Sequence, residues 1–122
     1  MMDLKQQTYI WVTCRFVAWH RWKDAPPSVA FLRDMHRHEF RVKVTLTVRH
    51  LNRDLEFFTE QAELKAFVQK RYEGARLEKS CESIAYEIAH FCVDWENVAF
   101  AECEVSEDGE NGAIVRLTEV NA

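Results

Sequence analysis

The sequence contains little glycine and little proline, with 3 Gly and 2 Pro among 122 residues. Average usage of these two residue types would give roughly fifteen in a chain of this length. This scarcity excludes a collagen-like, linker-rich or loop-dominated protein, because those classes depend on glycine and proline. We therefore expect long regular elements joined by few turns, in one domain covering residues 1–122.

Paired cysteines and long apolar runs are also missing. The four cysteines are scattered without a C-x-x-C pair, which argues against a disulfide framework and favours a reduced cytoplasm. Residues 1–7 contain no apolar signal core, and no apolar run is long enough to span a bilayer. We expect a cytoplasmic protein without membrane contact. The cysteines are Cys14, Cys81, Cys92 and Cys103.

The chain has no surplus of positive charge, since its formal net charge is −4. Nucleic-acid binding requires clustered cations, so we expect no nucleic-acid partner. One local group of basic residues has two interpretations: a solvated strand face, or a site on that face for an anion such as phosphate. The group is Arg33, Arg37, Arg41, Lys43 and Arg49.

The first half of the chain has the pattern of two strands. Residues 8–20 are rich in β-branched and aromatic side chains, which suit a pleated surface. Residues 21–35 contain two consecutive prolines and mixed charges, which indicate a loop. In residues 38–50, apolar and polar side chains alternate, which predicts a strand with one apolar face.

The second half changes to helical spacing and then returns to strands. Thr59 can cap a helix that ends near Tyr72, and Ser80 can cap a second helix with an apolar stripe. Residues 98–106 and 113–120 have strand character, and the Asp/Gly/Asn-rich turn between them supports a hairpin. The predicted order is ββααββ, an α+β arrangement.

Three of the five histidines have suggestive positions. His36 and His38 form an H-x-H pair at the start of the second strand, where residues two apart point to the same side. His20 ends the first strand and becomes a third ligand if the two strands pair. Three imidazoles suit zinc and leave a fourth position open for water or substrate. Alternatively, these are ordinary surface or core histidines; His50 and His90 have no partner at ligand spacing.

Four segments resemble motifs of the 6-pyruvoyl-tetrahydropterin synthase family, which includes the 6-carboxytetrahydropterin synthases of queuosine biosynthesis. Together they cover about residues 9 to 117 in the family's order. The matching family patterns are F-x-A-x-H, H-G-H-x-Y/F, T-x-E-N-L/V-A and an E-T hairpin. In this sequence they correspond to Phe16–His20, His36–Phe40, Ser80–Ala85, and Glu107 followed by Gly112–Ile114.

The resemblance implies a tunnelling fold, or T-fold: an antiparallel ββααββ sheet with two helices on one face, which oligomerises into a barrel. Trimers form such barrels and two trimers stack, so a homotrimer or hexamer is implied. The resemblance also implies that His20, His36 and His38 bind zinc. Glu107 would anchor the pterin ring, since a carboxylate accepts two parallel hydrogen bonds from it. Ser80 would contact the pterin, or serve only as a helix cap.

The sequence departs from the family at its catalytic residues. Residues 28–35 contain no cysteine where the family has its catalytic thiol. Residues 70–79 contain no histidine where an L-D-H-x-x-L-N segment is expected, and this connection is short. Two substitutes are conceivable. Cys81 begins a helix, which lowers a thiol pKa, and Asp34 could act as a base on a metal-bound water.

The leading functional hypothesis is a zinc-binding protein of the pterin-synthase type. Its substrate would be a pterin or 7-deazaguanine precursor such as dihydroneopterin triphosphate, and its chemistry that of a lyase. The alternative is a catalytically inactive T-fold protein that binds a pterin, regulates, or serves only as an oligomeric scaffold. The simultaneous loss of both catalytic segments favours this alternative.

Overall fold

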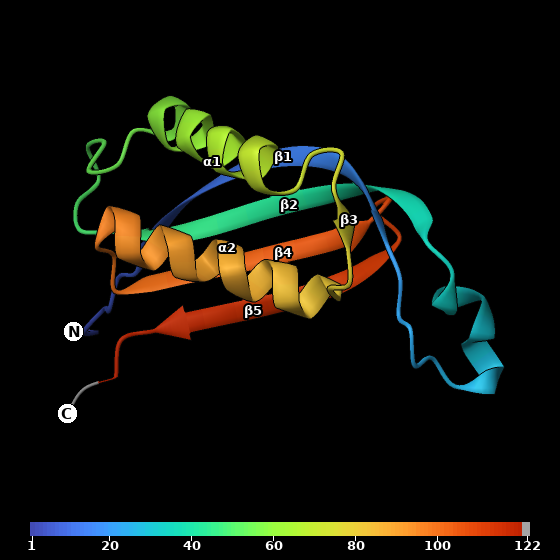
Figure 1. The fold of residues 1–122 in the computed structure, drawn as a ribbon. Coiled ribbons are helices and arrows are strands. Elements are labelled where there is room, and N and C mark those ends of the chain that lie inside the picture. Colours follow the sequence, from blue (N-terminus) through green and yellow to red (C-terminus); the bar gives the residue numbers. More distant parts are fainter. Residues whose placement is uncertain (121–122) are drawn as a thin grey trace.

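The computed structural model describes residues 1–120, which form an α+β fold with one curved sheet and two α-helices (Figure 1). The α+β class predicted from the sequence is confirmed. In chain order the elements are β1 (Thr8–His20), the 3-10 segment η1 (Pro27–Arg33), β2 (His36–Val48), α1 (Phe57–Arg71), β3 (Arg76–Leu77), α2 (Cys81–Glu96), β4 (Phe100–Glu107) and β5 (Asn111–Thr118).

The sheet has five strands in the order β3-β1-β2-β4-β5. The sequence predicted four antiparallel strands. The sheet is instead mixed, because a fifth strand, β3, pairs parallel with the end of β1. This strand escaped prediction because two residues show no periodicity. It forms where the chain crosses from α1 to α2, and it aligns Leu77 with His20.

Both helices cover one face of the sheet (Figure 1). The buried side chains of β1 and β2 occupy even-numbered positions, and those of β4 occupy odd-numbered positions, because alternate residues of a strand point to the same side. At the centre, the ring of Phe16 stacks on Phe40 at 4.9 Å and on Tyr72 at 5.2 Å. The opposite face has no covering element among residues 1–120.

The helix starts are partly as predicted. Ser80 caps α2, and its hydroxyl oxygen accepts a hydrogen bond from the Ser83 amide at 3.1 Å. Thr59, in contrast, is not the cap of α1. Glu56 takes this position, because its carboxylate accepts hydrogen bonds from the amides of Phe58 and Thr59. Residues 21–35, predicted to be a loop, contain the 3-10 segment η1.

The predicted hairpin joins β4 to β5, and next to the turn the two strands approach each other more closely than the sequence indicated. Asp108 and Gly109 have φ values of 57° and 75°, which Asp and Gly tolerate better than most residues. Gly112 is required for another reason: a Cβ atom there would lie 2.1 Å from the Val105 carbonyl oxygen. This turn therefore holds β4 and β5 close together.

Cysteine pairing and membrane-spanning helices were both expected to be absent. All four cysteines are free, and Cys92 and Cys103 are buried in the core. Neither helix of residues 1–120 combines the length and the apolar character needed to cross a membrane.

Candidate metal centre

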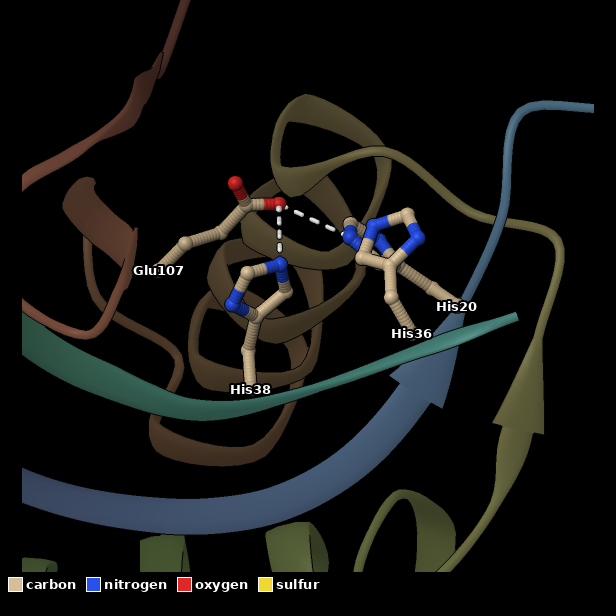
Figure 2. Close-up of side chains that lie close together, drawn as sticks. All are labelled: His20, His36, His38 and Glu107. Atoms are coloured by element: carbon tan, nitrogen blue, oxygen red, sulfur yellow. Dashed lines mark ion pairs between the residues drawn. The ribbon is translucent and has the colours of Figure 1, made fainter. Parts of the chain in front are cut away.

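Strand pairing brings the three predicted histidines together at one end of the sheet, on its helix-covered face. His20 of β1 lies opposite His36 of β2, and His38 lies one alternation further along the same face of β2. The ring centroids are 4.6 Å apart for His20 and His36, 5.0 Å for His36 and His38, and 5.3 Å for His20 and His38 (Figure 2). The predicted convergence is therefore present.

Each histidine has its Nδ1 atom committed to an oxygen outside the cluster. The Nδ1 of His20 lies 3.1 Å from the Lys79 carbonyl oxygen, and that of His36 lies 2.8 Å from the Asp34 carbonyl oxygen. The Nδ1 of His38 lies 2.7 Å from Asp108 Oδ2. Carbonyl and carboxylate oxygens only accept, so Nδ1 must donate in each contact. In the neutral rings, every Nε2 therefore carries a lone pair.

This protonation pattern fits a metal ion. Metal-binding histidines commonly donate one ring N–H to a carbonyl or carboxylate and ligate through the other nitrogen. The clearest observation is the Nε2 atom of His36, which is buried and has no hydrogen-bond partner. Such an orphaned acceptor is costly unless a cation or proton occupies the space in front of it. The three residues present are therefore suited to zinc.

The structure adds Glu107, the last residue of β4, to the three histidines. Its Oε2 atom lies 2.8 Å from Nε2 of His20 and 3.8 Å from Nε2 of His38, while its other carboxylate oxygen points away from the rings (Figure 2). One potential ligand atom from each of the four residues lies within 4.8 Å of the others. From the sequence, Glu107 was predicted only to bind a pterin, not to lie among the histidines.

Burial favours the neutral form of His20. Desolvation lowers the pKa of His20, and the nearby His36 and His38 lower it too, against the opposing effects of the Lys79 carbonyl and Glu107. A neutral imidazole is the form that binds a metal ion. The local electrostatics therefore favour the neutral His20 ring that metal binding requires.

Asp108 is a site residue that the sequence did not reveal in this role. Its Oδ1 atom accepts from the Glu39 amide at 3.0 Å, while its own amide donates to the Glu39 carbonyl at 2.8 Å. These bonds hold the carboxylate so that Oδ2 faces His38, and the His38 hydrogen bond is the main cause that lowers the Asp108 pKa. The Asp-Gly turn was the only signal available in the sequence.

A pocket of about 680 Å³ opens beside the histidines at the start of α2. This volume lies within the range of roughly 300–1,000 Å³ that is common for small-molecule sites. Ser80, Cys81 and Glu107 all line it, as do His20 and His36. The two predicted substrate-binding residues, Ser80 and Glu107, therefore border the same pocket as two of the three clustered histidines.

Of the two substitute catalytic residues, Cys81 lines the pocket and Asp34 does not. Cys81 is buried, and desolvation raises its pKa to about 12, with Glu107 and Glu82 raising it further. The expected lowering by the helix start is wrong here, because burial outweighs it. Asp34 is exposed, and its backbone carbonyl accepts a hydrogen bond from Nδ1 of His36.

The basic residues of the sequence do not form one anion site. Arg37, Arg41 and Lys43 share the uncovered sheet face, whereas Arg33 donates to the Ala25 carbonyl and Arg49 pairs with Asp54. A hollow of about 1130 Å³ borders Arg41 and Lys43, but carboxylates line it as well, and no histidine does. The solvated-face interpretation fits this mixture of charges. The carboxylates are Glu39, Glu104 and Glu110.

Comparison with known proteins gives a match in structure but none in sequence. No protein-family model matches the chain, and no curated protein matches it. A 6-pyruvoyl tetrahydropterin synthase from Plasmodium falciparum superposes with a TM-score of 0.71 at 14% identity, covering 93% of this chain and 99% of the other. The Plasmodium vivax enzyme, in a variant whose catalytic glutamate is replaced by alanine, gives 0.70 at 14%, with the same coverage.

A second kind of pterin-related protein has the same fold. A putative dihydroneopterin aldolase from Vibrio cholerae superposes with a TM-score of 0.65 at 11% identity, covering 94% of this chain and 100% of the other. Identities this low establish the fold alone. The chain therefore has the tunnelling fold that the motifs implied. A 6-pyruvoyl tetrahydropterin synthase and a putative dihydroneopterin aldolase both have this fold.

Proposed function

We propose that this protein is a zinc-binding pterin protein of the 6-pyruvoyl- or 6-carboxytetrahydropterin synthase type. Its ligand would be a pterin or 7-deazaguanine precursor such as dihydroneopterin triphosphate. The observation that supports this most strongly is the three-histidine cluster, in which every Nδ1 is committed to an oxygen and Nε2 of His36 is buried without a partner. The adjoining pocket supplies space for the ligand.

In this proposal, His20, His36 and His38 hold the zinc ion, which would polarise an oxygen of the substrate side chain. Glu107 would accept two parallel hydrogen bonds from the pterin ring, and Ser80 would contact it from the start of α2. The position of both residues on the pocket wall supports these assignments. Ser80 would do so while its oxygen still caps the helix.

The proton-transfer step is the least conserved part of the family pattern in this chain. The buried Cys81 lacks the thiolate that a nucleophile or base needs, since its pKa is raised to about 12. A carboxylate is the better substitute: the Plasmodium vivax relative has a glutamate as a catalytic residue. In this protein Asp34 would take that part, because it is exposed and its backbone carbonyl accepts a hydrogen bond from His36, a proposed zinc ligand.

The alternative is a protein that binds a pterin without converting it, or that serves as a regulator or scaffold. The absence of a cysteine in residues 28–35 and of a histidine in residues 70–79 favours it. In either case we propose a cytoplasmic homotrimer or hexamer, since the uncovered sheet face and the sheet edges are available for subunit contacts.

Metal analysis of the purified protein tests the proposal first. We expect about one zinc ion per chain in the native protein and far less in a His36→Ala variant. Zinc-free protein that also fails to take up added zinc would contradict both the enzyme and the metal-pocket hypotheses.

Ligand binding and turnover then separate the two candidate functions. A fluorescence titration with neopterin should show binding that Glu107→Ala weakens, and equal binding by both proteins would remove Glu107 from the pocket. Incubation with dihydroneopterin triphosphate should give a tetrahydropterin product if the protein is an enzyme. Intact binding without product would instead support the inactive binder.

A further inference from the structure

We propose that Glu107 is the fourth ligand of the metal ion when no pterin is present, and that pterin binding draws it away. This inference rests on the proposed function and refines it. Three histidines alone leave an open, catalytic type of centre, whereas three histidines and a carboxylate form a closed tetrahedral one. Glu107 would thus change partners between the metal and the pterin.

The distances support a shared centre. In a tetrahedral zinc site with bonds of about 2.0 Å, the ligand atoms lie about 3.3 Å apart. The Oε2 atom of Glu107 lies 2.8 Å from Nε2 of His20 and 3.8 Å from Nε2 of His38, on either side of that value. One ligand atom from each of the four side chains, that of His36 included, lies within 4.8 Å of the others, so small adjustments bring all four onto one ion.

The hydrogen bonds of His20 also support a shared metal centre. Nδ1 of His20 donates to the Lys79 carbonyl, so in the neutral ring Nε2 turns a lone pair toward the Glu107 carboxylate. Two lone pairs facing each other require a cation or a proton between them. Among residues 1–120, the only ion-pair partners of Glu107 are His20 and His38, so no lysine or arginine supplies that charge.

The backbone explains why Glu107 faces inward. It lies opposite Phe40 in the β2–β4 pairing, on the same face as the histidines, and the following turn is bonded to Glu39. One carboxylate oxygen meets the rings while the other points away (Figure 2). A rotation of this side chain could exchange the metal contact for a pterin contact without moving the strand.

Metal affinity and metal spectroscopy test this inference without relying on activity. Chelator competition with zinc should show at least about tenfold weaker binding by Glu107→Gln, since loss of even an outer partner of a ligand typically changes affinity 10–100-fold. The matched control is Glu110→Gln, on the same hairpin. Glu107→Asp, which keeps the charge but withdraws the oxygen, gives a second variant should the first misfold.

Cobalt-loaded protein reports the coordination directly. Addition of neopterin should change the visible cobalt absorption of the wild type and leave that of Glu107→Gln nearly unchanged. If wild type and both Glu107 variants bind zinc equally and give the same cobalt spectrum, this inference is wrong while the proposed function stands. If the wild type binds neither metal, the proposed function fails as well.

Discussion

At the scale of single residues, the main finding is that hydrogen bonds outside the cluster fix the histidine tautomers. Two of the three acceptors are backbone carbonyls, of Lys79 and Asp34, which substitution does not remove. The third is the side chain of Asp108, so this contact can be tested by mutation.

Replacing Asp108 with asparagine should weaken zinc binding by about 10–100-fold, the usual effect of losing such a partner. The amide keeps the size of the side chain but removes the charge that faces His38. Chelator competition measures the change. Asp94→Asn is the control, because it removes a carboxylate from an exposed histidine, His90, 3.0 Å away. Equal losses in both variants would contradict the assigned role of Asp108.

The cysteines should be unreactive in the folded protein. Burial raises the pKa of Cys14 to about 11 and that of Cys81 and Cys92 to about 12, and it raises the pKa of Cys103 as well. Iodoacetamide at pH 7.5 should therefore label them only after unfolding, as measured by mass spectrometry. Rapid labelling of native Cys81 would restore it as a candidate nucleophile.

At the scale of elements, the β4–β5 hairpin and the α1–α2 pair each have a feature that the sequence pattern does not show. The hairpin requires a close approach of two strands at Gly112. The helices bring together the three carboxylates of Glu60, Glu63 and Glu96, whose oxygens lie within 4.8 Å of one another.

Gly112→Ala should destabilise the protein by about 1–3 kcal/mol, the usual cost of overpacking. The added Cβ would lie 2.1 Å from the Val105 carbonyl oxygen, so the strands must separate. Urea unfolding measures the change in free energy. Gly74→Ala is the comparison: it meets no atom within 4 Å and strains only a φ of 72°, at about 1–2 kcal/mol. A loss of well under about 1 kcal/mol for Gly112→Ala would be the contradicting result.

The carboxylate cluster should make stability fall as the pH rises. Desolvation and the neighbouring Glu63 and Glu60 carboxylates raise the Glu96 pKa to about 8, so the folded state binds its proton more tightly than the unfolded state. This stabilisation is complete below the ordinary pKa of 4.5 and is lost as the pH rises through about 8. Between pH 4.5 and 8.5 the free energy of unfolding should decline less in Glu96→Gln than in the wild type. In the exposed Glu104→Gln it should decline as much as in the wild type.

At the scale of the whole molecule, one sheet face and two sheet edges are uncovered among residues 1–120. Beyond its short pairing with β3, the outer edge of β1 has no strand beside it, and neither does the outer edge of β5. Exposed Trp11 and Ile114 lie on the uncovered face. Edges of this kind are normally paired or protected.

The proposed homotrimer or hexamer predicts that the protein sediments as three or six copies. Joining the edge of β5 in one subunit to that of β1 in the next would close a barrel and leave no edge free. Sedimentation velocity over a range of protein concentrations gives the mass. A monomer throughout that range would contradict the proposed assembly.

The sequence by itself determined the α+β class, the two long strands, the Ser80 helix start and the three histidines. These features depend on local periodicity and on nearest-neighbour pairing, which are readable from the order of residues. Even the convergence of His20 with His36 and His38 required only that consecutive strands pair.

Only the tertiary structure decided which atoms complete the site. Glu107 is the last residue of β4, and Asp108 begins the turn that follows, 70 residues after His38. Their contacts with the histidines depend on the β2–β4 register. Burial, which depends on the whole fold, reversed the expected pKa shift of Cys81. The two-residue strand β3 is likewise too short to have a periodicity, and it pairs with β1 where the connection between α1 and α2 meets the sheet edge, so no local pattern could predict it.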